Sequence, residues 1–313
     1  MELKGLFEAT ELLERAERRA SSKREVEPVV EKRIPPAPVL RPEVRFESHE
    51  ATSAATLEMP EDSELEATDD LPTPFDRFRT ILVPDAAKNR ILCLTDADSA
   101  AAEAFRLLGV RLRHLRRERT LARVLITSTI PQEGKSTVAA NLACTLSTRQ
   151  RTLLLEGDIR RPSLSQVFGL NGKLGLSECL RGEAELEKCI YHLEGPGFWI
   201  LPAGSFAGNP LELLQSSRLS ALMDRLSEWF HWIIIDSPPV LPLADTSVWA
   251  RTADGILLVV RQGTTEKRQL QRGIEALEPQ KLVGALLNSS ETAAGQTYYY
   301  KNSDQQPVDT SAS

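Results

Sequence analysis

The chain has 313 residues, of which 41% are apolar, and its formal net charge at pH 7 is -6. This length allows one large or two medium domains, and the apolar content is sufficient for a hydrophobic core. The acidic balance gives no reason to expect nucleic acid as a partner. The N-terminus, MELKGLFEATELLERAERRA, is too charged for a signal peptide, so we expect a cytoplasmic protein. Its four cysteines show no metal or Cys-x-x-Cys spacing and are expected to be ordinary free thiols: Cys93, Cys144, Cys179 and Cys189.

The N-terminal quarter of the chain differs in composition from the rest. Residues 1–20 place apolar side chains on a roughly helical stripe, which predicts a short amphipathic helix, either solvated or docked to a partner. Residues 21–75 are rich in proline and acidic side chains and contain few aromatics. Such a segment cannot bury enough surface to offset its ordering entropy, so we predict a disordered linker.

The folded domain is predicted over residues 76–290, followed by a flexible tail over 291–313. A brief extended segment is expected at Asn89–Thr95. Residues 99–123 then carry Phe105, Leu108, Leu112 and Leu115 on one helical face. The arginines of that helix either form a solvated face or contact a neighbouring subunit, anionic lipid or the acidic linker.

After residue 123, apolar strand-like runs alternate with helical stretches, which predicts a parallel sheet covered on both faces. Such folds place their ligands at the carboxyl ends of the strands. Helices are expected at Lys135–Thr148, Arg218–Trp229 and Glu266–Leu277. The expected strands are Val124–Thr127, Thr152–Leu155, Phe198–Leu201, Trp232–Ile235, Ile256–Val260 and Leu282–Leu287.

The stretch VLITSTIPQEGKSTVAANLA, from Val124 to Ala143, has the strand, loop and helix order of a phosphate-binding loop. Thr129 stands where the usual pattern has its first glycine. Backbone N–H groups at the start of the helix attract a polyphosphate, Lys135 reaches its β- and γ-phosphates, and Ser136 can ligate Mg²⁺. The residues expected to contact the nucleotide are Gln132, Glu133, Gly134, Lys135, Ser136, Thr137 and, beyond the loop, Arg160.

Two further strands end in carboxylates. LLLEGDIRRP carries Glu156 and Asp158, and WIIIDSPP carries Asp236 after four apolar residues. Carboxylates at such positions can order the water shell of Mg²⁺ or accept a proton. We therefore expect Lys135, Glu156, Asp158 and Asp236 to be catalytic, with Ser136, Asp158 and Asp236 at the metal.

Together these stretches, with SAAAEAFRLL and GILLVVRQGTT, resemble the bacterial tyrosine kinases of capsule and exopolysaccharide assembly. The resemblance spans roughly residues 99–288. It implies an α/β fold, the three-layer sandwich of P-loop NTPases with a mostly parallel sheet, and ATP and Mg²⁺ as cofactors. The related cell-division and plasmid-partition ATPases carry a lysine five residues before the loop lysine, where this chain has Ile130. That difference favours the kinase branch.

The resemblance also implies a substrate and partners. Three of the four tyrosines are adjacent, Tyr298, Tyr299 and Tyr300, at the position where the family autophosphorylates its tail. The expected partners are other copies of the chain in a homo-oligomer and a separate membrane-anchored co-polymerase that activates the kinase at the inner face of the membrane. Two residues depart from the family pattern: Glu156 replaces an aspartate and Gly109 replaces an arginine of the oligomerisation helix. The alternatives are a P-loop ATPase switch and an ATP-binding pseudokinase scaffold.

Overall fold

The computed structural model describes residues 74–88, 90–205, 208–241 and 244–288. The predicted N-terminal helix, nearly all of the predicted linker, and the tail with its three tyrosines lie outside these residues. None of the helices in the described ranges has the length and apolar content needed to cross a bilayer.

The core of the described part is one eight-stranded sheet in the order β1-β4-β5-β3-β6-β2-β7-β8. All neighbouring strands are parallel except β4 and β5. All six predicted strands are confirmed, and β1 and β4 are additional. The bounds are β1 Arg79–Leu82, β2 Arg123–Ser128, β3 Thr152–Glu156, β4 Tyr191–Glu194, β5 Trp199–Leu201, β6 Trp232–Asp236, β7 Gly255–Arg261 and β8 Leu282–Asn288.

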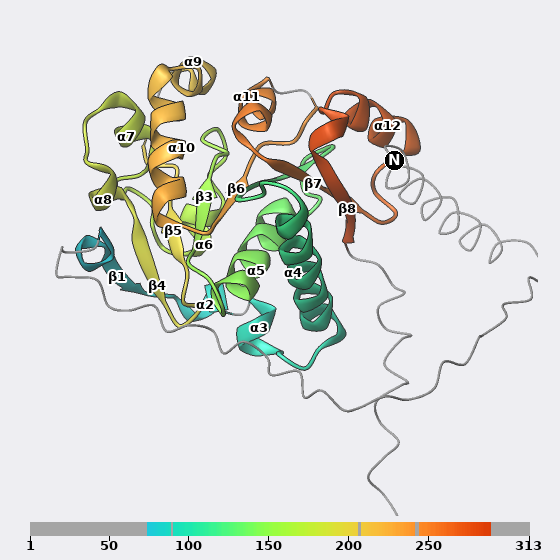
Figure 1. Ribbon diagram of the computed structural model, residues 1–313, viewed down its shortest axis with the longest axis horizontal. Coiled ribbons are helices and arrows are strands. Elements are labelled where there is room, and N and C mark those ends of the chain that lie inside the picture. Colours follow the sequence, from blue (N-terminus) through green and yellow to red (C-terminus); the bar gives the residue numbers. More distant parts are fainter. Residues whose placement is uncertain (1–73, 89, 206–207, 242–243, 289–313) are drawn as a thin grey trace, which may run out of the picture. The chain divides into compact units, whose positions relative to one another are not determined.

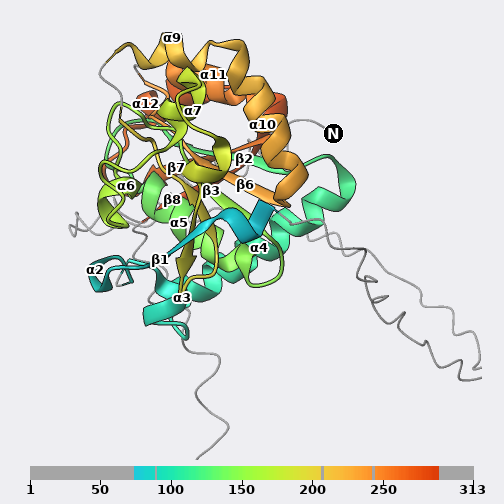
Figure 2. The ribbon, with the colours of Figure 1, turned by 90° about the vertical axis from the view of Figure 1, so that its left-hand side faces the viewer.

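Helices cover both faces of this sheet (Figures 1 and 2). The helix after β2, α5, packs against β2, β3 and β6, and α4 packs beside it, while α10 contacts β6 and α11 contacts β2. This arrangement confirms the predicted fold class. The bounds are α2 Asp85–Lys88, α3 Leu92–Thr95, α4 Ala100–Glu118, α5 Lys135–Ser147, α6 Leu164–Val167, α7 Leu176–Arg181, α8 Leu186–Cys189, α9 Pro210–Leu214, α10 Ser217–Trp229, α11 Asp245–Thr252 and α12 Lys267–Glu275, with short 3₁₀ turns at Pro74–Arg77 and Pro279–Lys281.

The strands that lead to the predicted site are the most deeply buried part of the sheet. Every residue of β3 and β6 is buried, and so is every residue of β2 after Arg123. Their apolar runs therefore occupy the middle layer of the fold, and the first polar residue after each run emerges at the same edge of the sheet. This placement brings the ends of β2, β3 and β6 together.

Helix α4 begins where its sequence predicts. Ser99 is the N-cap, and its side chain accepts a hydrogen bond from the Ala102 amide at 3.1 Å. The arginines of α4 do not all form a solvated face. The Arg116 guanidinium lies 4.9 Å from the Trp232 ring centre, and it donates to the His231 carbonyl, so this side chain packs on the domain.

Two predictions made from the sequence are wrong. Residues 89–95 were expected to be extended, but Leu92–Thr95 form α3, because the Thr95 and Leu94 amides donate back to the Ile91 carbonyl. Four free thiols were expected, but Cys93 on α3 forms a disulfide with Cys144 on α5, while Cys179 and Cys189 are free. The paired cysteines are 51 residues apart in sequence, and only the packing of α3 on α5 brings them together.

Candidate active site

The phosphate-binding loop lies between the end of β2 and the start of α5. Gly134 is the N-cap of α5 and has φ 92°, a left-handed conformation that glycine adopts without strain. Gln132 also has a positive φ, 67°. A Cβ at position 134 would overlap the Asn288 side-chain amide, which donates to the Glu133 carbonyl at 2.9 Å. The loop conformation therefore requires glycine at position 134. The first glycine of the usual motif is not required in the same way, because Thr129 stands there.

The Glu133 side chain holds the loop from inside. It is fully buried, and its carboxylate accepts hydrogen bonds from the Ile130 amide at 2.8 Å, the Arg261 amide at 3.3 Å and the Thr265 hydroxyl. These contacts tie the loop to the end of β7 and the segment before α12. The carboxylate is thus committed to the protein, and only the backbone of Glu133 is available to a phosphate.

Lys135 lies between two of the predicted carboxylates. Its Nζ is 3.2 Å from Asp158 Oδ2, 3.7 Å from Asp236 Oδ1 and 3.4 Å from Ser136 Oγ. Burial opposes the positive charge, but Asp236 and Asp158 outweigh it and raise the pKa of Lys135 above its usual value. The ammonium group is therefore charged and held at the mouth of the loop, where it can bind the β- and γ-phosphates.

Asp236 is fully buried at the end of β6, and neither of its carboxylate oxygens has a hydrogen-bond partner among the described residues. Burial raises the pKa of Asp236 to about 6, with Lys135 acting in the opposite direction. Apart from the Lys135 ammonium at 3.7 Å, nothing among the described residues compensates this buried carboxylate, which costs stability unless a ligand completes its hydrogen-bonding shell. Asp236 thus fits a cation site.

The donor set near Asp236 also fits Mg²⁺ rather than a transition metal. In the part of the chain that the structure describes, no group of three or more His, Cys, Asp or Glu side chains has metal-binding geometry. Mg²⁺ is usually held by one or two carboxylates together with phosphate oxygens and water, so two aspartates and the Ser136 hydroxyl suffice. The predicted ligands Ser136, Asp158 and Asp236 therefore fit the ion.

Glu156 does not face this centre. Its buried carboxylate accepts hydrogen bonds from the Leu164 amide at 2.6 Å, the Ser165 amide and hydroxyl, and the Ala203 amide at 3.0 Å. Burial raises the pKa of Glu156, and the donors, Ser165 first, partly offset that effect. Its oxygens fix the start of α6 and the segment after β5. Glu156 is thus a positioning residue in this structure, and Asp158 is the acid nearest Lys135 on the β3 side.

Arg160 and Ser163 follow Asp158 on the same loop. The Arg160 guanidinium donates twice to buried Asp245 on α11, at 2.6 and 3.0 Å, and still lines the pocket. Ser163 Oγ donates to Ser136 Oγ at 2.9 Å. Sequence reasoning missed Ser163, which lies immediately after the Arg-Arg-Pro run, and it also missed Arg90, which comes from the turn before α3.

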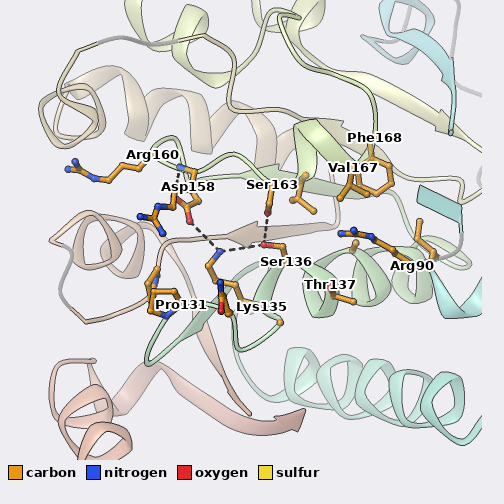
Figure 3. A pocket seen from close by; sticks show the side chains of 17 residues that line it. Arg90, Pro131, Lys135, Ser136, Thr137, Asp158, Arg160, Ser163, Val167 and Phe168 are labelled. Atoms are coloured by element: carbon orange, nitrogen blue, oxygen red, sulfur yellow. Dashed lines mark hydrogen bonds and ion pairs between the residues drawn. The ribbon is translucent and has the colours of Figure 1, made fainter. Parts of the chain in front are cut away.

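These side chains surround one cavity of about 690 Å³ (Figure 3). The structure brings Gln132, Gly134, Lys135, Ser136, Thr137, Asp158 and Arg160 to its wall. Asp236 lies behind Lys135, and Glu133 and Glu156 support the wall from the protein interior. Tyr298, Tyr299 and Tyr300 lie outside the described residues.

A mostly parallel sheet with a phosphate-binding loop after β2 and aspartates beyond β3 and at the end of β6 defines a protein of the P-loop NTPase class. No protein-family model matches the chain. Tyrosine-protein kinase YwqD of Bacillus subtilis (strain 168) is 31% identical over 221 residues, which are 69% of this chain and 93% of YwqD. The chain therefore belongs to the bacterial tyrosine kinase family, and the predicted family and enzyme class are confirmed.

Other relatives agree with this assignment. Tyrosine-protein kinase etk of Escherichia coli (strain K12) is 30% identical over 227 residues, 72% of this chain but 30% of that longer protein. Among solved structures, the kinase domain of Escherichia coli tyrosine kinase ETK matches with a TM-score of 0.61 at 30% identity, covering 69% of this chain and 84% of the domain. The chimerical protein CapA2B2 also has a TM-score of 0.61, at 27% identity, covering 67% of this chain and 91% of the chimera.

Proposed function

We propose that this protein transfers the γ-phosphoryl group of ATP to tyrosines 298–300 of its own tail, in trans between subunits, and thereby regulates capsule or exopolysaccharide synthesis. The observation that carries the proposal is the cluster of Lys135, Asp158 and Asp236 behind a phosphate-binding loop. The polysaccharide role rests on the family resemblance.

The cluster supplies the groups that phosphoryl transfer requires. The amides at the start of α5 and the Lys135 ammonium would bind the β- and γ-phosphates. Ser136, Asp158 and Asp236 would hold Mg²⁺, which when bound neutralises charge on the phosphate oxygens. Asp158 lines the cavity beside Lys135, and in this proposal it would accept the proton of an entering tyrosine hydroxyl. Glu156 positions this wall by holding the start of α6.

The tail is long enough to reach an active site. Tyr298 is eleven residues beyond Leu287, so an extended chain spans about 36–40 Å. That reach permits delivery to an adjacent subunit as well as to the chain's own site. The expected activator is a membrane-anchored co-polymerase, through which the kinase would be recruited to the inner face of the membrane. The chimerical protein CapA2B2 among the relatives is in keeping with a second polypeptide.

A phosphate map by mass spectrometry tests the proposal. Purified protein is incubated with Mg-ATP, with and without a candidate activator, and phosphate is located in the tail. We expect phosphate on Tyr298–Tyr300 in the wild type and none in Lys135→Met. Phosphate confined to serine or threonine, or none under any activating condition, would overturn it.

Mixing variants tests transfer between subunits. Lys135→Met protein with an intact tail is incubated with a second variant that has all three tyrosines changed to phenylalanine. Phosphate appearing on the Lys135→Met tail supports trans transfer, because only the other chain is active. If the triple phenylalanine variant hydrolyses ATP as fast as the wild type and neither protein gains phosphate, the chain is an ATPase switch. If the chain binds nucleotide but turns none over, it is a scaffold.

A further inference from the structure

A disulfide joins the segment at one wall of the active-site cavity to the helix that follows the phosphate-binding loop. Cys93 lies on α3, and Cys144 lies on α5, nine residues after Lys135. The two residues immediately before α3, Arg90 and Ile91, line the cavity, and Figure 3 shows the Arg90 side chain there. The covalent bond is therefore close in sequence to the cavity wall, and the contacts described so far for phosphate binding do not use it.

Helix α3 has little hydrophobic attachment of its own. None of its four residues is buried, although Ile91 before them is fully buried. Asn141 on α5 donates to the Arg90 carbonyl at 2.9 Å and accepts from the Leu92 amide at 2.7 Å. Cys144 follows Asn141 by three residues and lies on the same side of α5. The cavity wall is thus held to α5 by hydrogen bonds and by a covalent bond, and the covalent bond is the part that redox conditions can change.

The two sulfur atoms differ in accessibility. Cys93 is half-buried, whereas Cys144 is 3% exposed and belongs to the hydrophobic core. Thiol–disulfide exchange begins at a sulfur that a reagent can reach, so Cys93 is the point of entry. The two free cysteines are less suited to the reaction. The neighbouring Cys189 and burial raise the pKa of Cys179, which leaves little of the reactive thiolate.

We propose that Cys93 and Cys144 form a thiol–disulfide switch, in which the disulfide holds the Arg90 wall in its nucleotide-binding position and reduction releases it. This inference rests on the proposed use of ATP. The sequence leads us to expect a cytoplasmic chain, and disulfides in that compartment are usually transient and redox-sensing. The reaction partner is a small-molecule disulfide, represented here by glutathione disulfide.

The exchange needs only the two thiols and glutathione disulfide. The Cys93 thiolate attacks one sulfur of glutathione disulfide, whose S–S bond breaks, and the first glutathione thiolate leaves. The Cys144 thiolate then attacks the Cys93 sulfur, which forms the protein disulfide and releases the second glutathione. Two electrons pass from the cysteine sulfurs to glutathione disulfide, and the two thiol protons end on the released glutathione molecules. Two molecules of glutathione reverse the reaction.

Defined glutathione buffers test the switch on the full chain. The protein is equilibrated from reducing to oxidising ratios, quenched with acid and alkylated, and its cysteine pairing is mapped by mass spectrometry. We expect the Cys93–Cys144 pair to interconvert reversibly while Cys179 and Cys189 stay free. The disulfide closes a long loop in the unfolded chain, so the oxidised protein should have a Tm higher by roughly 4–16 °C. It should also bind Mg-ADP at least about threefold more tightly by titration, because more molecules have the wall in place.

Two variants isolate the bond. Cys93→Ser removes the disulfide with little change in size, and it should match the reduced wild type in Tm and Mg-ADP affinity in every buffer. Cys179→Ser is the matched control, because it removes another half-buried cysteine, on α7 and outside the cavity lining. This control should keep the full redox response of the wild type.

Each other outcome overturns the switch. A Cys93–Cys144 pair that stays oxidised or stays reduced in every buffer cannot regulate binding, and a redox response that persists in Cys93→Ser belongs to other residues. A change in Tm without a change in Mg-ADP affinity would show a purely structural disulfide. Failure of the proposed function is read separately. If the oxidised chain binds Mg-ADP with the expected redox response but phosphorylates no tyrosine, the tail phosphorylation fails and the switch stands, whereas a chain that binds no Mg-ADP in either state refutes both.

Discussion

Asp236→Asn tests how much the ionised, buried carboxylate of Asp236 destabilises the native protein. A folded pKa of about 6 against an ordinary value of 3.8 means that ionised Asp236 costs the native state about 3 kcal/mol at pH 7. Between these two values the native protein keeps a proton that the unfolded chain has lost. The free energy of unfolding of the wild type therefore decreases as the pH rises from 3.8 to about 6, and Asp236→Asn does not show this decrease.

The assay is urea unfolding of both proteins at several pH values from 3.5 to 7.5, without nucleotide or Mg²⁺. The stability of Asp236→Asn minus that of the wild type should grow by about 3 kcal/mol across the range. The buried amide adds a cost of its own, but that cost does not depend on pH, so it shifts the difference between the two proteins without changing its slope. Asp98→Asn removes one exposed charge and is the matched control. A difference that stays flat with pH, or that falls, would refute the reasoning.

Three further changes follow from the site. Gly134→Ala should weaken Mg-ADP binding at least about tenfold by titration, because the Cβ overlaps Asn288 and strains a left-handed residue; unchanged affinity would contradict it. Glu156→Gln should lower the free energy of unfolding by about 2–3 kcal/mol, measured in urea. The reason is that one carboxylate oxygen, which accepts hydrogen bonds from neighbouring amides and a hydroxyl, becomes an NH₂ group that cannot accept them. An unaltered unfolding midpoint would show that those contacts are weak. Ser163→Ala should lower the rate of tail phosphorylation severalfold with unchanged stability, through its contact with Ser136, and equal rates would exclude that role.

Much of the site could be predicted because its chemistry is local or follows from strand order. The stretch from Val124 to Thr137 contains the strand, the loop and the helix start in one continuous segment. Asp158 and Asp236 follow buried apolar runs, and parallel strands deliver their carboxyl ends to one edge of the sheet. Periodicity predicted the fold class. Motif spacing identified Lys135, Asp158 and Asp236, and the structure brings the Lys135 ammonium to 3.2 Å and 3.7 Å from the two carboxylates.

Whether an acidic side chain near a strand end points into the site or into the protein interior could not be predicted from the sequence. Glu156 and Glu133 are acidic, adjacent to the loop motifs and plausible ligands from sequence alone. The structure turns both inward, because backbone amides of α6, β7 and the segment after β5 reach their oxygens first. Which donors surround a carboxylate depends on segments distant in sequence, and their positions are set by tertiary packing.

The sequence by itself predicted an α/β fold with a phosphate-binding loop, because periodicity and a contiguous motif carry that information. The resemblance of its motifs indicated the bacterial tyrosine kinase family. Only the tertiary structure showed which parts of the domain the segment around β1 and α3 contacts. β1 pairs with β4 more than a hundred residues later, Asn141 clamps the turn before α3, and Cys93 meets Cys144. No pattern in residues 79–95 indicates these neighbours. Arg90 consequently reached the active-site cavity through long-range packing, which a single sequence does not display.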